Sequence, residues 1–255
     1  MTAFAALHHG DTPLLLPNAW DHASAAALAA RGFPAVGTTS LGVAAAAGLP
    51  DGAAATRDET LRLALTLGSA PFLLSVDAEG GFSDDPDEVG EFARELAAVG
   101  AVGINLEDGL GPADLHAAKI AAVKSAAPDL FVNARTDTYW LGEGEGERDG
   151  EDTLRRLDAY QQAGADGVFV PGLSDPAAIG ALVDRLDAPL NILYAPTGPT
   201  VHHLADLGVR RVSLGSLLYR RALGAMLETV TEIAEGRSPR GAAPSYDEIA
   251  ALGRP

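Results

Sequence analysis

Cysteine is absent from the 255-residue chain, and lysine occurs only at Lys119 and Lys124. Without cysteine the protein has no disulfide, no thiolate metal ligand and no cysteine nucleophile. Both lysines belong to one predicted helix, whereas a Schiff-base lysine must lie in the active site. Covalent imine chemistry and the usual pyridoxal-phosphate anchor are therefore not expected.

Positive charge is scarce as well. The chain has 18 lysines and arginines against 35 aspartates and glutamates, which gives a net charge of −17. Such a surface repels phosphate backbones and anionic membranes, so we expect no nucleic-acid partner and no membrane partner. Met1–Gly10 lacks the basic start and apolar core of a signal peptide, and no uninterrupted apolar run reaches ~18 residues. These features predict a cytoplasmic protein.

What the sequence does contain is an alternation of short apolar runs and helical patterns. Eight runs are rich in valine, leucine, isoleucine or phenylalanine, which is typical of strands buried on both faces. They are Leu14–Asn18, Ala35–Ser40, Pro71–Asp77, Gly103–Asp108, Leu130–Arg135, Gly167–Pro171, Leu190–Ala195 and Arg211–Leu214. Eight strands separated by helices predict an α/β protein, a (β/α)₈ TIM barrel that forms a single domain over residues 1–255.

Local signals mark where the predicted helices begin and end. Asp85 and Asp175 each precede a proline, the pattern of an N-cap followed by proline at the first helical position. Gly100, Gly164 and Gly208 each lie between a predicted helix and the next strand, where a left-handed glycine commonly ends a helix. These positions support the alternation of helices and strands.

Acidic residues follow two neighbouring predicted strands. Asp77 and Glu79 follow the third strand, and Glu107 and Asp108 end the fourth; barrel active sites lie at these strand ends. Carboxylates packed together repel each other unless a cation intervenes, and oxygen ligands without cysteine or histidine suit Mg²⁺ or Mn²⁺. We therefore expect a divalent metal site here. The alternative is that these acids only cap the following helices.

Arg135 ends the fifth predicted strand. A buried arginine is costly unless it is paired. It either pairs with the acids of the neighbouring strands or holds a substrate carboxylate through two hydrogen bonds. Because no strand offers a lysine as an electron sink, a metal acting as a Lewis acid on a 2-oxo acid is the expected chemistry.

Four segments make the sequence resemble the isocitrate lyase/phosphoenolpyruvate mutase family. They are TTSLGVAAAAGLPD at Thr38–Asp51, SVDAEGGFSDDP at Ser75–Pro86, GINLEDG at Gly103–Gly109 and NARTDTY at Asn133–Tyr139. Each segment is weakly specific alone, but their order and spacing together are highly specific. The resemblance implies a (β/α)₈ barrel that uses Mg²⁺ to bind a 2-oxo acid or its enolate, and that acts on a C–C or C–P bond beside that centre.

The resemblance also implies a metal site built on acids. Asp77 matches the direct ligand of the Mg²⁺ (or Mn²⁺) ion. Asp51, Glu79 and Glu107 match acids that hold metal-bound waters, and Glu79 stands where many members have the shorter aspartate. These four residues are the expected metal site.

The resemblance implies a substrate site as well. Thr39, Ser40 and Leu41 match a turn that binds the substrate carboxylate through a hydroxyl group and backbone N–H groups. Arg135 matches the arginine that contacts the substrate. Arg135 and Asp77 are the expected catalytic residues, and both are also expected to bind the substrate.

The chain departs from the family pattern at two places. Isocitrate and methylisocitrate lyases carry a mobile loop after the fourth strand, with a KKCGH-type motif whose cysteine serves as an acid. Here Glu107-Asp108 is followed only by GLGPAD before the next helix, and the loop residues of phosphonopyruvate enzymes have no match either. Val170-Pro171 replaces the family's histidine after the sixth strand.

These residues predict a metal-dependent carbon–carbon lyase that acts on a small 2-oxo acid. Decarboxylation of an oxaloacetate-like substrate demands least of the protein, because it requires no acid from a gating loop. The open alternatives are a methylisocitrate lyase-like enzyme, a phosphonopyruvate or phosphoenolpyruvate mutase-like enzyme, and a 2-oxo-acid or oxalate-binding protein with little catalysis.

The last long helix is predicted at Leu217–Ala234, within a C-terminal helical segment at 217–255. Its leucine, methionine, valine and isoleucine residues cover more than one helical stripe. The simpler interpretation is that the helix closes its own barrel. The family resemblance implies instead that the helix is exchanged between subunits, which predicts a homodimer or homotetramer.

Overall fold

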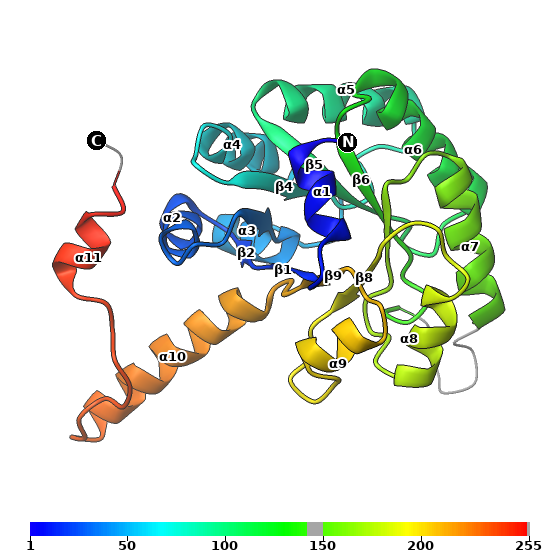
Figure 1. Ribbon diagram of the computed structural model, residues 1–255. Coiled ribbons are helices and arrows are strands. Elements are labelled where there is room, and N and C mark those ends of the chain that lie inside the picture. Colours follow the sequence, from blue (N-terminus) through cyan, green and yellow to red (C-terminus); the bar gives the residue numbers. More distant parts are fainter. Residues whose placement is uncertain (142–149, 254–255) are drawn as a thin grey trace.

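The computed structural model describes residues 1–141 and 150–253, so residues 142–149 and 254–255 of the predicted domain lie outside it. Nine parallel strands form one sheet that is curled into a nearly closed barrel (Figure 1). They are β1 (Leu14–Leu16), β2 (Asn18–Ala19), β3 (Ala35–Thr38), β4 (Leu73–Asp77), β5 (Ala101–Glu107), β6 (Phe131–Arg135), β7 (Gly167–Phe169), β8 (Leu190–Leu193) and β9 (Arg211–Ser213). The predicted α/β barrel architecture is confirmed.

The first predicted strand is divided in two. Pro17 separates β1 from β2, and proline has no N–H group to donate to a sheet. The carbonyl of Leu16 accepts from the N–H of Leu214 (3.2 Å), whereas the carbonyl of Pro17 accepts from Gly37 (2.8 Å). β1 therefore pairs with β9 and β2 with β3, so a single N-terminal run joins the two edges of the sheet.

Helices surround the strands (Figure 1). They are α1 (Ala3–Ala6), the 3₁₀ helix η1 (Leu7–His9), α2 (His22–Ala30), α3 (Ser40–Ala47), α4 (Arg57–Leu67), α5 (Pro86–Ala98), α6 (Ala113–Ala126), α7 (Gly150–Gln162), α8 (Pro176–Val183), α9 (Val201–Asp206), α10 (Leu217–Ala234) and α11 (Tyr246–Ala250). The core lies between the two layers, where Leu74, Val76 and Ile104 of the strands meet Phe92 and Leu96 of α5.

The predicted helix ends are confirmed. Asp85 and Asp175 accept hydrogen bonds from the first turns of α5 and α8, each with proline in the first turn. Gly100, Gly164 and Gly208 all have left-handed backbone conformations. At Gly100 a Cβ atom would lie 2.3 Å from the carbonyl oxygen of Gly68, so no larger residue fits there.

The N-terminal residues close the bottom of the barrel. In Figure 1, α1 lies across this end of the strands, and Phe4 packs there with Leu14, Leu16 and Phe131. The His8 ring stacks on Phe131 with centroids 4.3 Å apart. Burial lowers the pKa of His8 to about 3, and the charge of Arg211 adds to this effect. His8 is therefore neutral at physiological pH.

Helix α10 extends away from the barrel, and α11 returns toward α2 (Figure 1). His22 Nε2 lies 2.9 Å from the carbonyl oxygen of Leu252, which ties the returning segment to α2. Leu227 and Val230 of α10 are 63% and 62% exposed. The exchange of this helix between subunits remains a prediction.

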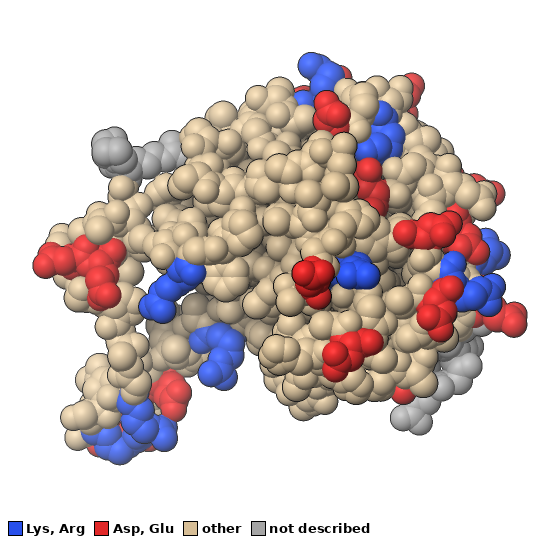
Figure 2. Space-filling view, in the orientation of Figure 1, with Lys and Arg blue, Asp and Glu red and all other residues tan. Residues whose placement is uncertain are grey.

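One face of the molecule carries mixed charge. On the face drawn in Figure 2, lysine and arginine side chains lie among aspartate and glutamate side chains. None of the helices that the structure describes is long and apolar enough to span a membrane.

The neutral His8 predicts a loss of stability in acid. Its pKa is about 3 in the folded protein and near 6.5 in the unfolded chain, so the unfolded chain binds the extra proton between these values. Stability is complete above pH 6.5 and falls as the pH drops toward 3, by about 2 kcal/mol at pH 5 from this residue. We expect His8→Phe, which keeps the stacked ring, to have a shallower pH dependence in urea unfolding from pH 7 to 5. Parallel curves for the two proteins would contradict this assignment.

Candidate active site

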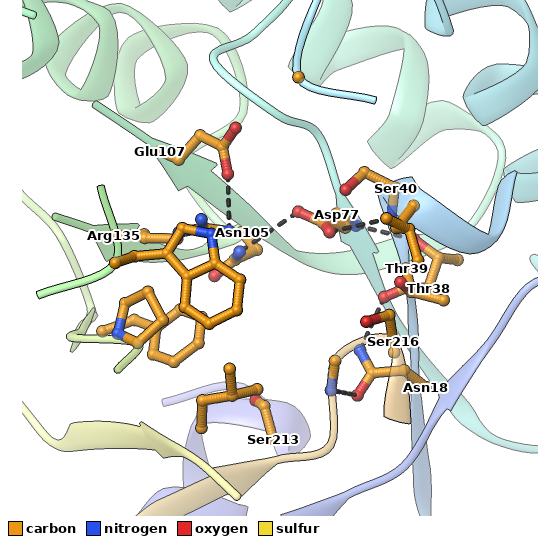
Figure 3. A pocket seen from close by; sticks show the side chains of 18 of the residues that line it. Asn18, Thr38, Thr39, Ser40, Asp77, Asn105, Glu107, Arg135, Ser213 and Ser216 are labelled. Atoms are coloured by element: carbon orange, nitrogen blue, oxygen red, sulfur yellow. Dashed lines mark hydrogen bonds and ion pairs between the residues drawn. The ribbon is translucent and has the colours of Figure 1, made fainter. Parts of the chain in front are cut away.

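A cavity of about 440 Å³ opens at the C-terminal ends of the strands. Seven of the residues predicted for the site line it: Thr39, Ser40, Leu41, Asp51, Asp77, Glu107 and Arg135. In Figure 3, Asp77, Thr39 and Ser40 lie on one side of this cavity, and Arg135 and Glu107 lie on the other. The fold thus brings together residues that are far apart in the sequence, such as Thr39 and Arg135, which are separated by 96 positions.

Asp77, the last residue of β4, is held from three directions (Figure 3). Its Oδ2 accepts the backbone N–H of Ser40 (3.0 Å), and its Oδ1 accepts the side-chain amide of Asn105 (3.3 Å). Its own N–H donates to Thr38 Oγ1 (2.8 Å). Asn133 donates in turn to Asn105 (2.8 Å). The carboxylate is therefore fixed by neutral donors, beside the positive end of the α3 dipole.

Three further carboxylates line the cavity with Asp77, those of Asp51, Glu107 and Asp137. Burial raises the pKa of Asp51, and the charge of Asp77 adds to this effect. Burial also raises the pKa of Glu107 to about 8; Arg135 opposes this shift, and the charges of Asp77 and other acids reinforce it. Negative charge in this cavity is thus incompletely compensated by the protein itself, a condition that a bound cation relieves.

Glu79 is buried and is not among the residues that line the cavity. Its Oε1 accepts from Thr56 Oγ1 (2.5 Å), and its Oε2 accepts from the N–H of Ala54 (3.1 Å). Ala54 and Glu79 both have positive φ angles, 54° and 47°. Such conformations are strained for residues with a side chain and often occur at functional sites. Glu79 thereby holds the turn that carries Asp51.

The oxygen donors of this cavity fit a hard divalent cation. Within residues 1–141 and 150–253, no three histidine, aspartate or glutamate side chains lie close enough together to ligate one ion directly. A cage of three carboxylates is therefore not formed there. The donor set is compatible with one direct ligand, Asp77, and with acids that contact the ion through water.

Arg135 is an ion-paired residue of the cavity wall. Its Nη1 lies 2.7 Å from Glu107 Oε2, and its Nε lies 2.6 Å from Asp137 Oδ1. The guanidinium group also lies 5.9 Å from the centre of the Phe169 ring. The sequence left open whether Arg135 pairs with acids or contacts a substrate, and the structure contains the pairing with acids. Because Arg135 also lines the cavity, contact with a substrate stays open as well.

Asp108 does not join the other acids, contrary to the expectation that both acids at the end of the fourth predicted strand converge. Its Oδ2 accepts from Arg156 Nη1 (3.0 Å) and from the Tyr160 hydroxyl (2.7 Å), both on α7. Burial acts against ionisation, yet the Tyr160 hydrogen bond and backbone donors, including Asp137, hold the pKa of Asp108 below its usual value. Asp108 joins the strand end to α7 because β5 ends at Glu107 and frees the next side chain to turn outward.

Among the residues that line the cavity, sequence reasoning missed Asn105 and Arg211. Asn105 precedes Glu107 by two positions, and the alternation of side chains along a strand would place both on one face. Arg211 is a charged residue that begins an otherwise apolar predicted strand. Both signals were present in the sequence.

Comparison with known proteins identifies the family. The family model described as Phosphoenolpyruvate phosphomutase matches residues 4–234. The uncharacterized protein Rv1998c of Mycobacterium tuberculosis (strain ATCC 25618 / H37Rv) is 42% identical over 254 residues, which cover 98% of this chain and 95% of that protein. The chain therefore belongs to the phosphoenolpyruvate phosphomutase family, within the PEP mutase/isocitrate lyase superfamily.

Solved structures have the same fold. A protein of Burkholderia cenocepacia J2315, described as a candidate lyase/mutase, superposes with a TM-score of 0.88 at 37% identity, over 99% of this chain and 95% of that one. A phosphonopyruvate hydrolase in complex with oxalate and Mg²⁺ superposes with a TM-score of 0.83 at 25% identity, over 98% of this chain and 93% of that one.

The buried contacts of Asp108 predict a structural role. Asp108→Asn removes one of the two carboxylates that pair with the largely buried Arg156, the other being Asp152, so we expect a loss of about 2 kcal/mol in the free energy of unfolding. The matched change Asp129→Asn, at an exposed turn residue, should cost less than about 0.5 kcal/mol. Urea unfolding measures both variants. Equal stabilities would show that the pair with Arg156 contributes nothing.

Proposed function

We propose that the protein is a Mg²⁺- or Mn²⁺-dependent lyase that acts on a small 2-oxo acid, by decarboxylation of an oxaloacetate-like substrate or by a related C–C cleavage. One observation carries the proposal. Asp77 is fixed by neutral donors in a cavity where further carboxylates are incompletely compensated. Superfamily members act on small acids, and the phosphonopyruvate hydrolase structure contains oxalate and Mg²⁺.

Four acids would hold the metal. Asp77 would be the direct ligand, Asp51 and Glu107 would orient its water ligands, and Glu79 would act on these indirectly. When bound, the ion supplies positive charge that stabilises negative charge developing on the 2-oxo oxygen. Glu79 contributes through the turn that carries Asp51, because both of its oxygens already accept hydrogen bonds from that segment.

The carboxylate of the 2-oxo acid would lie at the start of α3. Thr39 precedes this helix, and Ser40 and Leu41 are its first residues. The first N–H groups of a helix have no acceptor within the helix and point toward anions. Ser40 N–H already donates to Asp77, and the Ser40 hydroxyl is hydrogen-bonded to Asp51, so Leu41 N–H and the Thr39 hydroxyl remain for the substrate. Arg135 would complete the carboxylate site from the opposite wall.

The short connection between β5 and α6 favours decarboxylation within this class. Five residues, 108–112, separate the two elements, and they include no cysteine or lysine. Decarboxylation breaks the C–C bond when CO₂ leaves, and water can protonate the carbon that remains. Cleavage of a methylisocitrate-like substrate or transfer of a phosphoryl group would require an acid or cation that this connection does not supply.

The same connection favours a second candidate function, a 2-oxo-acid or oxalate-binding protein with little catalysis. The metal and carboxylate sites would be kept while the catalytic loop is lost. Mg²⁺-dependent binding of oxalate belongs to both functions, whereas turnover belongs only to the lyase.

A substrate screen tests the lyase. The purified protein with Mg²⁺ is assayed against oxaloacetate, methylisocitrate and phosphonopyruvate, with Mg²⁺ alone as the control for uncatalysed decarboxylation. We expect Mg²⁺-dependent turnover of oxaloacetate or a close 2-oxo acid. Turnover of methylisocitrate or phosphonopyruvate alone would refute this choice of substrate, and oxalate binding without any turnover would favour the binding protein.

Replacement of Asp77 tests the metal site. Asp77→Ala should abolish Mg²⁺-dependent binding of oxalate in calorimetry, because it removes the direct ligand. Asp51→Asn and Glu79→Gln should weaken it by about 10–100-fold, as expected for residues that act through other ligands. Circular dichroism checks that each variant is folded. Full Mg²⁺-dependent affinity in a folded Asp77→Ala protein would show that the ion binds elsewhere.

We also propose that the protein is a homodimer or homotetramer in which α10 packs against a second copy. The exposed apolar side chains of α10 support this assembly: Leu223, Met226, Leu227, Val230 and Ile233. Light scattering at micromolar concentration should give a mass of at least twice the 26.1 kDa of one chain. Met226→Glu with Val230→Glu should lower that mass. A wild-type mass near 26.1 kDa would refute the proposal.

A further inference from the structure

Arg211 is a buried cation without a carboxylate partner. It is the first residue of β9, is 3% exposed and lines the cavity. Its Nε donates to Ser213 Oγ (3.0 Å). Its Nη1 has no hydrogen-bond partner among the described residues, and no described acid lies within ion-pair distance. An unpaired buried guanidinium group costs free energy, so a bound anion would stabilise this arrangement.

The surroundings of Arg211 do not neutralise it. Ser213 is engaged with Asn191 across the neighbouring strand (3.0 and 3.1 Å). His8, below it, is kept neutral. Burial lowers the pKa of Arg211 to about 9, and the charge of Asp77 opposes this shift. Arg211 therefore remains a cation at neutral pH, and Asp77 is the acid whose charge reaches it.

The other cation of the cavity wall is in a different state. Arg135 is paired with both Glu107 and Asp137, so its charge is already compensated within the protein. Arg211 has none of these contacts. An anionic ligand that enters the cavity therefore gains more binding free energy at Arg211 than at Arg135. At Arg211 it accepts a hydrogen bond from an unpaired N–H group and also neutralises an uncompensated charge.

We propose that Arg211 binds a second carboxylate of the substrate, so that the protein selects short 2-oxo dicarboxylates over 2-oxo monocarboxylates. The assignment rests on the proposed function, which places the first carboxylate at the start of α3. A planar guanidinium group offers two parallel N–H donors to a carboxylate. Arg211 is then a specificity-determining residue.

The test compares pyruvate with oxaloacetate, which differ by one carboxylate. Their affinities are measured by displacement of oxalate in the presence of Mg²⁺, over the first minutes after mixing. We expect wild-type protein to bind oxaloacetate at least 10-fold more tightly than pyruvate. Arg211→Gln should reduce that preference to less than 3-fold, while oxalate affinity changes by less than 3-fold. Arg211→Lys should keep part of the preference because it keeps the charge.

Each other outcome is informative. Equal wild-type affinities for oxaloacetate and pyruvate would overturn the assignment without any variant. An equal loss of all three ligands in a folded Arg211→Gln protein would indicate a structural role and would also overturn it. Tighter binding of phosphonopyruvate than of oxaloacetate, lost in Arg211→Gln, would assign the site to a phosphonate instead. Failure of wild-type protein to bind oxalate with Mg²⁺ would overturn the proposed function, and this assignment with it.

Discussion

The carboxylate of Asp77 is the constraint on which the rest of the site depends. It is held by the N–H of Ser40 and the amide of Asn105, and no described lysine or arginine forms an ion pair with it. Neutral donors fix its position and leave its charge available. The barrel makes this possible because β3, β4 and β5 are neighbours in parallel register, so their C-terminal ends deliver Ser40, Asp77 and Asn105 to one place.

The two arginines that line the cavity differ in how their charges are compensated. Arg135 is compensated by Glu107 and Asp137, and this pairing fixes its guanidinium group in the cavity wall. Arg211 lies deeper and is uncompensated. A cation near Asp77 and an anion near Arg211 would together remove the charge imbalance. This arrangement is what a complex of a divalent metal with a dicarboxylic acid supplies, and it links the proposed function to the further inference.

Much of this architecture could be predicted from the sequence. The apolar runs and the glycines at 100, 164 and 208 identify the barrel because burial on both faces and left-handed helix ends leave local signals. Strand ends also locate Asp77 and Arg135, since the fold brings all such ends to one face. Side-chain direction beyond a strand end could not be predicted: Asp108 turns toward α7, and Glu79 turns toward Thr56. The division of the first strand at Pro17 could not be predicted either. It depends on the pairing of β1 with β9 and of β2 with β3, which exists only once the barrel closes.

The most direct test of the account is the position of the metal. Crystals grown with Mn²⁺ and oxalate would reveal the ion by its anomalous diffraction. We expect one strong peak in the cavity, within about 2.0–2.3 Å of an Asp77 carboxylate oxygen as expected for a directly ligated ion of this class, and no other carboxylate at that distance. A peak on another acid with Asp77 unbound, or oxalate bound without an ion, would contradict it.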